Sequence, residues 1–421
     1  MKKLNFLCLV TLIYICISSC LKKVDVEQTG TSAGLINVTP TEGTKNTIIN
    51  ISGNQFPDAS GITVTVNGKT AVIIGSTSTN IQAKVASGSG SGPVVVSFGG
   101  KGYTGPNFNY INSSFIVTSI TNGIQGYLDG PVTTAQYEDI EGISIDGADN
   151  LYNAQYGSSS TQNKVRKLNL NTLIVSTLDS AVGGGAEFLS SDAAGNVFVA
   201  DEDNNQITKI DPSGTASLLA SPAFAIQGIK VAKSGNIYVS GPTTIAKFSS
   251  TGNLIWSLIS HDSAGPANVD GDTSLAQFSL YGNIEVDDTE KNIYVQNTNP
   301  GGVPTSIKLL SLTDNTITTI AGSPTVRGNV DGAASSARFG LIYSVILDKE
   351  GGLYIADASN NTIRYLNNGN VRTVIGGVKG DQDGNGLNVK LSNPQGFAWD
   401  SKGNLYVSDY SNYKIKKIEI E

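Results

Sequence analysis

The sequence has very little histidine, methionine, cysteine and charge. Its 421 residues include one His, one Met and three Cys, and only 15% are Asp, Glu, Lys or Arg. A single histidine excludes a metal site built from several histidines of one chain. The formal net charge of −7 argues against nucleic acid as a partner, because its phosphates would be repelled. Few charges together with 48 glycines suit short strands and turns better than helices.

The first twenty residues have the pattern of an export signal. Lys2 and Lys3 precede an apolar stretch, residues 4–17, which is too short to span a bilayer comfortably. The stretch ends in Ile17-Ser18-Ser19-Cys20, which resembles a bacterial lipobox, and the resemblance implies cleavage before Cys20 and acylation of its thiol. The alternative is an ordinary secretory signal with a chance cysteine.

We therefore expect residues 1–19 to be a lipoprotein signal peptide and residues 20–34 to be a lipidated tether. Cys8 and Cys16 would leave with the signal, so the exported chain would have no disulfide. The expected location is the cell envelope, as an outer-membrane lipoprotein held by its lipid, with the periplasmic or surface side left open.

Residues 35–111 alternate short strands with turn residues. The strongest local signal is Asn67-Gly68 between two strands, because both positions of a tight hairpin turn need positive φ. The order of Val38-Thr39-Pro40, Gly43, the segment 51–56 and Val66-Asn67-Gly68 resembles a TIG/IPT immunoglobulin-like domain. The resemblance implies a spacer or binding module, and no catalytic group is recognisable in it.

From residue 115 to 421 one pattern recurs six times, at intervals of 40 to 60 residues. An apolar strand ends in or near Asp, a turn carries Gly-Asn, and the next strand has an aromatic residue at its second position. This period is typical of propeller blades, and we expect the aromatic residues to be wedges in the core. They are Tyr152, Phe198, Tyr238, Tyr294, Tyr354 and Tyr406.

The clearest copy runs from Gly396 to Asp409, and the pattern resembles the NHL-repeat family, which implies a six-bladed β-propeller. The last repeat lacks an outermost strand, and residues 115–120 match the outer strands of other repeats. We therefore expect the early strand to complete the last blade, so that the ring has no open edge. The expected fold class is all-β: an immunoglobulin-like β-sandwich followed by a six-bladed β-propeller closed by its first strand.

Antiparallel connectivity places the start of each inner strand on the same face of the ring as four long Asp-Gly loops, at residues 129–130, 270–271, 331–332 and 383–384. Long loops on a rigid scaffold often carry function. The residue five before each inner-strand Asp should line the channel mouth on this face. These positions carry two carboxylates, two amides and a phenol, which can bind a polyhydroxylated ligand or can simply face water. The positions are Glu141, Glu187, Gln227, Gly282, Tyr343 and Gln395.

Three further sets of residues are candidates for a role. Asp201, Asp357 and Asp409 each precede an Asn by three residues, which predicts capping of the following loop. Asp381, Asp383 and Asn385 form a weak calcium candidate, since Ser392 stands where a twelfth-position Glu would complete the loop. Tyrosines outside the repeat register could stack on sugar rings. They are Tyr127, Tyr137, Tyr156, Tyr281, Tyr343 and Tyr410.

Together these features favour a non-catalytic, lipid-anchored envelope protein that binds a glycan or a protein on the loop-rich propeller face, without a cofactor. The arrangement resembles exported lipoproteins of Bacteroidota. One alternative is a hydrolase, lyase or lactonase-like enzyme using Glu141 and Glu187. Similar lyase propellers depend on several histidines, whereas this chain has only His261. The other alternative is a structural or adhesive envelope scaffold.

Overall fold

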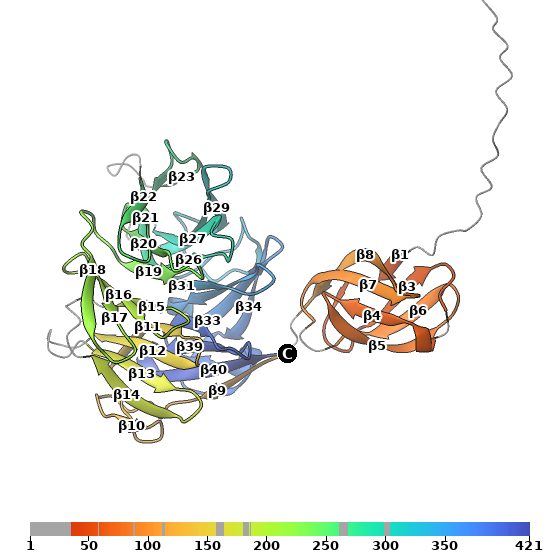
Figure 1. The fold of residues 1–421 in the computed structure, drawn as a ribbon, viewed down its shortest axis with the longest axis horizontal. Coiled ribbons are helices and arrows are strands. Elements are labelled where there is room, and N and C mark those ends of the chain that lie inside the picture. Colours follow the sequence, from red (N-terminus) through yellow and green to blue (C-terminus); the bar gives the residue numbers. More distant parts are fainter. Residues whose placement is uncertain are drawn as a thin grey trace, which may run out of the picture.

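The computed structural model describes residues 35–421, except 58, 87–88, 112–113, 157–163, 180–184, 186, 261–267 and 299–303. Cys20, the signal and tether, and His261 lie outside the described residues. Within them the chain is almost entirely β-structure, and its only helices are four 3-10 turns of three residues each. No helix among these residues has the length and apolar character that crossing a membrane requires. Figure 1 shows a small β-domain beside a larger propeller.

The small domain is the expected immunoglobulin-like sandwich. Its strands follow the order β1-β3-β6-β5-β4-β7-β8-β2, and β5 joins the two layers because it pairs with both β4 and β6. Alternate residues of the strands, such as Ile49 and Ile51, are buried in its core. The strands are β1 (Leu35–Thr39), β2 (Glu42–Gly43), β3 (Ile48–Gly53), β4 (Thr63–Val66), β5 (Lys69–Ser76), β6 (Asn80–Lys84), β7 (Gly92–Phe98) and β8 (Lys101–Tyr110).

The predicted hairpin turn is confirmed. Val66 of β4 pairs with Lys69 of β5, and the two residues between them have φ values of 48° for Asn67 and 79° for Gly68. Positive φ at both positions gives a turn whose twist matches that of the flanking strands. The local sequence therefore fixes the register of this pair.

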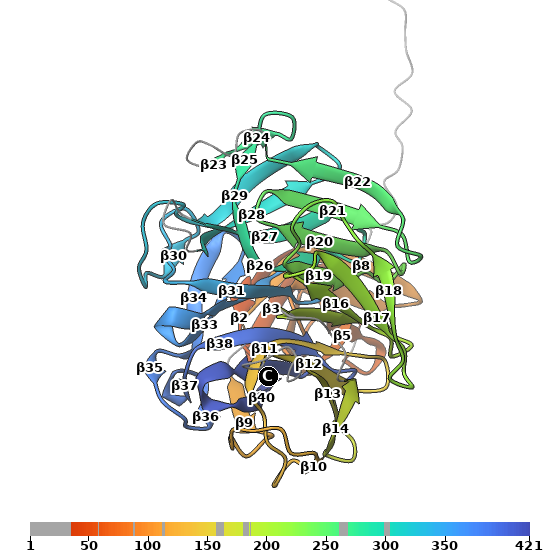
Figure 2. The same ribbon diagram turned by 90° about the vertical axis from the view of Figure 1, so that its left-hand side faces the viewer.

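The larger domain is a ring of six blades, each a sheet of four main antiparallel strands. The innermost strands surround the central axis in Figure 2. Blade one contains β11 (Asp139–Ile145), β12 (Asn150–Tyr156), β13 (Lys164–Asn169) and β14 (Ile174–Asp179); blade two β15 (Phe188–Ser191), β16 (Val197–Asp201), β17 (Gln206–Ile210) and β18 (Ala216–Ala220); blade three β19 (Gly228–Val231), β20 (Ile237–Gly241), β21 (Thr244–Phe248) and β22 (Leu254–Ile259).

The remaining blades complete the ring. Blade four contains β26 (Leu280–Val286), β27 (Asn292–Thr298), β28 (Pro304–Ser311) and β29 (Thr316–Gly322); blade five β31 (Ile342–Leu347), β32 (Leu353–Asp357), β33 (Thr362–Asn367) and β34 (Asn370–Gly376); blade six β38 (Pro394–Trp399), β39 (Leu405–Asp409), β40 (Lys414–Ile420) and β9 (Phe115–Ser119). Two further pairs lie in loops: β23 (Asn268–Val269) with β25 (Gln277–Phe278), and β35 (Val378–Lys379) with β37 (Lys390–Leu391).

The expected closure of the ring is confirmed. Strand β9, the first of the propeller, pairs antiparallel with β40, the last strand of the chain, so that Val117 lies opposite Ile418 and Ser119 opposite Lys416. Strand β9 is thereby the fourth strand of blade six. Closure of this kind leaves no blade without a neighbour on either side.

The repeated aromatic residues pack in the core, as predicted. Five of them are buried, and Tyr294 is half-buried. Two of the tyrosines also bond to carboxylates of the turns: Tyr152 Oη donates to Asp146 at 2.8 Å, and Tyr238 Oη donates to Glu290 at 2.7 Å. These two rings thus contribute apolar area while their hydroxyl groups bond to a turn.

The four Asp-Gly loops each add a short fifth strand to the outer edge of a blade. These strands are β10 (Gly130–Pro131), β24 (Gly271–Asp272), β30 (Gly332–Ala333) and β36 (Gly384–Asn385). The aspartate of each loop accepts hydrogen bonds from the backbone and hydroxyl of a Thr or Ser on the outer strand, and pairs with a fully buried cation on the third strand. The four sets are Asp129 with Arg166 and Thr177, Asp270 with Lys308 and Thr319, Asp331 with Arg364 and Thr373, and Asp383 with Lys416 and Ser119.

These sets explain why a chain with few charges buries four basic side chains. A buried cation is costly unless it has a partner, and removing that partner leaves the cost uncompensated. The sequence analysis associated the Asp-Gly loops with function, but their aspartates hold the outer strands together.

Replacing Asp270 by Ala should therefore lower the free energy of unfolding by on the order of 2 kcal/mol, because Lys308 stays buried without its carboxylate. Replacing Asp288, whose ion pair with Lys233 is exposed, should change it by less than about 0.5 kcal/mol. Adding Lys308→Met to Asp270→Ala should restore part of the loss. Urea unfolding measures all three, and equal effects of the two aspartate substitutions would contradict this account.

Candidate functional site: the channel mouth

Neighbouring inner strands approach closely at glycines beside the channel mouth. The N–H of Gly142 in β11 donates to the carbonyl of Glu187 at 3.0 Å, and a Cβ at Gly142 would lie 2.8 Å from the same oxygen. A Cβ at Gly396 of β38 would lie 2.4 Å from the carbonyl of Glu141. Only glycine fits at these contacts, so the residues beside them are held at the rim of the ring.

Two of the predicted mouth residues meet across the ring. Tyr343 Oη of blade five donates a hydrogen bond of 2.8 Å to Glu141 Oε2 of blade one, although blade six lies between them. Two further rings surround Tyr343, with centroid distances of 5.5 Å to Phe188 and 6.3 Å to Tyr281. The mouth therefore combines a carboxyl group with an aromatic cluster.

The two glutamates of the mouth hold protons more strongly than ordinary carboxyl groups. Burial and the charge of Glu187 together raise the pKa of Glu141 to about 8, although the hydrogen bond from Tyr343 opposes both effects. Burial also raises the pKa of Glu187 to about 7, with added repulsion from Glu202 and Asp203. Near neutral pH the mouth therefore carries less negative charge than its composition indicates.

Several buried polar atoms on or next to the two innermost strands of the blades have no hydrogen-bond partner among the described residues. Gln227 donates from Nε2 to Glu202 Oε1 at 2.9 Å, but its Oε1 has no partner. Gln395 is 4% exposed and its Oε1 also has none. Buried polar groups normally have a partner, so these atoms are positions at which a water or a ligand could complete the hydrogen bonding. The other such atoms here are Glu187 Oε2, Gln155 Nε2, and both Nε2 and Oε1 of Gln296.

The sequence register identified most of this group but missed Gln296 and Glu202. At Gly282, the predicted position of blade four, φ is +97° and a Cβ would lie 3.0 Å from Gln296 Oε1. The amide of the adjacent strand β27 thus lies beside the position where the other blades carry a side chain. Glycine at a register position, followed by a polar residue late in the next strand, was the available signal.

The other candidates have mixed outcomes. The three loop-capping aspartates are confirmed, since the following Asn donates to each at 2.7–2.9 Å. Tyr137 and Tyr343 were wrong as exposed stacking residues, because Tyr137 is fully buried beneath Arg166 and Tyr343 is buried in the aromatic cluster of the mouth. Tyr127 is half-buried near Lys164, Tyr410 is half-buried near Asp139, and the Tyr156 side chain lies outside the described residues.

The weak calcium candidate has lysine partners instead. Asp381 pairs with Lys414 at 2.6 Å and with Lys416 at 2.9 Å, and Asp383 pairs with Lys416 at 2.9 Å. These ammonium groups occupy oxygens that a cation would need, so the set does not fit calcium. Among the described residues, no three or more His, Cys, Asp or Glu side chains are grouped so that they could hold a metal ion.

Known proteins are similar in sequence to two parts of the chain. The model of the IPT/TIG domain family matches residues 35–114. A stretch of 78 residues is 41% identical to human NHL repeat-containing protein 2; it covers 16% of this chain and 11% of that protein, so this chain spans only a small part of its relative. The bovine protein of the same name matches at 40% identity over the same length.

Two solved structures resemble nearly the whole chain. A structural genomics protein of unknown function from Bacteroides thetaiotaomicron has a TM-score of 0.63 at 17% identity, and the match covers 93% of this chain and 99% of that one. An auxiliary nutrient binding protein from Bacteroides ovatus has a TM-score of 0.59 at 20% identity, with 92% and 98% covered. At these identities the likeness is one of fold.

The raised pKa values of the mouth predict a distinctive pH dependence. The unfolded chain releases the Glu141 proton near pH 4.5, whereas the folded protein keeps it to about pH 8. The native state thus binds more protons between these values, and this group lowers the stability as pH rises. Glu141→Gln should therefore lose less stability than the parent between pH 5 and 8.

Urea unfolding at several pH values measures this difference. Glu138→Gln is the matched control, because Glu138 accepts a hydrogen bond from Gln125 at 2.9 Å and takes no part in the mouth. A parent and Glu141→Gln variant with identical pH profiles would contradict the assignment.

Proposed function

We propose that this chain, in which an IPT/TIG domain precedes a six-bladed propeller of the NHL-repeat type, is a non-catalytic binding protein of the cell envelope. Its channel mouth would hold a glycan. The lipid on Cys20 would anchor it to the outer membrane, and residues 20–34 would be the tether. The mouth would take the sugar between its carboxyl groups, amides and tyrosines.

One observation carries this proposal: several buried polar atoms at the mouth have no hydrogen-bond partner among the described residues. Glu187 Oε2, Gln227 Oε1 and Gln395 Oε1 are acceptors, and Gln296 Nε2, whose amide lies beside Gly282, is a donor. Sugar hydroxyl groups both donate and accept, so one polyhydroxylated ligand can satisfy both kinds. The ring of Tyr281, which lies at the edge of the Tyr343 ring, offers the apolar contact that sugar faces favour.

The protonation of the mouth favours an uncharged ligand. Burial raises the pKa values of both glutamates, so that Glu141, with a pKa of about 8, is largely neutral near pH 7. A protonated carboxyl group can donate a hydrogen bond as well as accept one. A cationic ligand would instead have to remove these protons, which would weaken its binding at neutral pH.

The nutrient binding protein of similar fold supports a role in binding. A second candidate function is a glycan-cleaving enzyme, because a carboxyl group with a raised pKa is what a general acid requires. A purely structural or adhesive scaffold is the third possibility, and it gives the unpaired mouth atoms no role.

Glycan binding should therefore depend on the mouth residues. The protein without residues 1–20 keeps every described contact, and we expect it to retain at least one neutral glycan on an array. Calorimetry with that glycan should show a loss of affinity of about tenfold or more in the Glu141→Gln, Tyr343→Phe double variant, since each lost hydrogen bond contributes about 0.5–1.5 kcal/mol.

The same experiment separates the alternatives. Glu138→Gln should bind as the parent does. Cleavage of the retained glycan by the parent but not by Glu187→Gln would replace binding with catalysis. No retained glycan, together with recovery of one envelope protein in a pull-down, would overturn the proposal in favour of the scaffold.

A further inference from the structure

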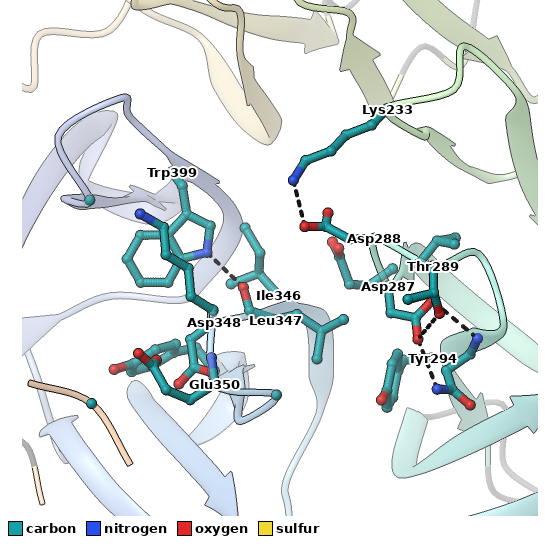
Figure 3. A pocket seen from close by; sticks show the side chains of 18 of the residues that line it. Lys233, Asp287, Asp288, Thr289, Tyr294, Ile346, Leu347, Asp348, Glu350 and Trp399 are labelled. Atoms are coloured by element: carbon teal, nitrogen blue, oxygen red, sulfur yellow. Dashed lines mark hydrogen bonds and ion pairs between the residues drawn. The ribbon is translucent and has the colours of Figure 1, made fainter. Parts of the chain in front are cut away.

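A second hollow lies on the opposite face of the ring, between the propeller and the sandwich. It has a volume of about 770 Å³ and lies at the ends of β19, β26, β31 and β38, whereas the channel mouth lies at their starts. Figure 2 looks at the propeller with the sandwich behind it, and Figure 3 shows the hollow from close by. The sandwich contributes Gly90, Ser91 and Tyr110 to its lining. We call it the interdomain cavity.

The two domains meet around this cavity through a few polar contacts. Lys45 of the sandwich forms an ion pair with Glu421 at the end of the chain. Asn368 Nδ2 donates to Asn109 Oδ1 at 3.3 Å, and a Cβ at Gly90 would lie 2.4 Å from Glu350 Oε1. A ligand in the cavity would therefore contact both domains and strengthen the association between them.

One wall of the cavity is aromatic and aliphatic. The indole of Trp399 is half-buried, and its Nε1–H donates to the carbonyl of Leu347 at 2.8 Å, which fixes the ring in place. Tyr354 supports the indole from the protein side with ring centroids 5.7 Å apart. In Figure 3 Ile346 and Leu347 lie beside this ring. Such a wall suits the apolar face of a sugar ring.

The facing wall is polar. Figure 3 shows Lys233, Asp288, Thr289 and Tyr294 across the hollow from Trp399. Lys233 and Asp288 form an exposed ion pair of 2.5 Å. These groups offer hydrogen-bond donors and acceptors at a distance from the indole that an extended ligand would bridge.

The charge of the lining selects against anions. The cavity is lined by three lysines and six acidic residues. Several of the acids already have partners in their own turns: Asp287 accepts from the Lys291 N–H at 2.9 Å, and Asp400 from the Asn404 N–H at 2.8 Å. Despite partial burial, hydrogen bonds from Lys291 N–H and Asn292 lower the pKa of Asp287, whereas burial raises the pKa values of Glu285, Asp348 and Glu350. Because acids outnumber lysines six to three, the lining repels an anionic ligand more than a neutral one.

We propose that the interdomain cavity is a second ligand site, which binds an uncharged oligosaccharide between the indole of Trp399 and the polar wall of blades three and four. Its volume lies within the usual range of about 300–1,000 Å³ for ligand sites. The site shares no residue with the channel mouth, so its occupancy does not depend on the function proposed for the mouth.

Tryptophan fluorescence tests this directly, because the chain has only two tryptophans. Trp256 packs against Tyr238 in blade three, and Trp256→Phe leaves Trp399 as the sole reporter. The probes are maltotetraose, cellotetraose and xylotetraose, with tetragalacturonate as the anionic counterpart. We expect at least one neutral probe to change the Trp399 emission saturably and tetragalacturonate to leave it unchanged.

Two further variants assign the response to its site. Adding Glu141→Gln and Tyr343→Phe should leave the dissociation constant within about twofold, whereas calorimetry on Trp399→Phe should show at least a tenfold loss for the same probe. Circular dichroism checks that Trp399→Phe keeps the β-fold. The proposal is overturned if no neutral probe responds, if tetragalacturonate binds equally well, or if the mouth variants abolish the response. Failure of glycan binding at the mouth alone would leave the Trp399 response in place.

Discussion

Pairing of the propeller's first strand with its last is the constraint on which the rest of the structure depends. Strand β9 supplies the outer strand of blade six, so six inner strands surround one axis and the two glutamates reach the same rim. The pairing also positions the sandwich. Only residues 111–114 separate β8 from β9, and Ser114 exchanges backbone hydrogen bonds with Glu421. Closure of the ring therefore builds the cavity behind it as well as the mouth in front of it.

Local patterns made the sandwich hairpin and the six repeats predictable, because each depends on residues within one or two strands. The closure was predictable because the last repeat lacks an outer strand and residues 115–120 match one. The register of the inner strands also identified Glu141, Glu187 and Tyr343. Their contacts were not predictable, since Tyr343 and Glu141 are 202 positions apart and meet only across the ring. Tyr137 shows the same limit: its burial depends on Arg166, whose guanidinium lies over its ring. The cavity depends on how two domains meet, which no periodicity encodes.

The carboxylates of this acidic chain fall into two groups with different surroundings. Those of the turns accept backbone hydrogen bonds, as Asp192 does from Asn196, and those of the Asp-Gly loops also neutralise buried cations such as Lys308. At Asp270 and Asp383, the buried lysine and the outer-strand hydrogen bonds outweigh burial and lower the pKa of the carboxyl group. Glu141 and Glu187 instead face a phenol, each other and further acidic residues, so burial raises their pKa values. The ring gains no stability from this placement.

That contrast is the strongest physical reason to assign function to the mouth. The propeller pairs a buried cation with a loop aspartate in four separate blades, although Arg166 Nε of one of these sets has no partner among the described residues. At the mouth it leaves Glu187 Oε2, Gln227 Oε1 and Gln395 Oε1 without partners among the described residues. Apolar side chains at these positions would make the folded protein more stable, because unsatisfied buried polar atoms cost free energy. Polar side chains that weaken the fold, at positions where apolar ones would fit, are expected where a ligand forms the missing hydrogen bonds.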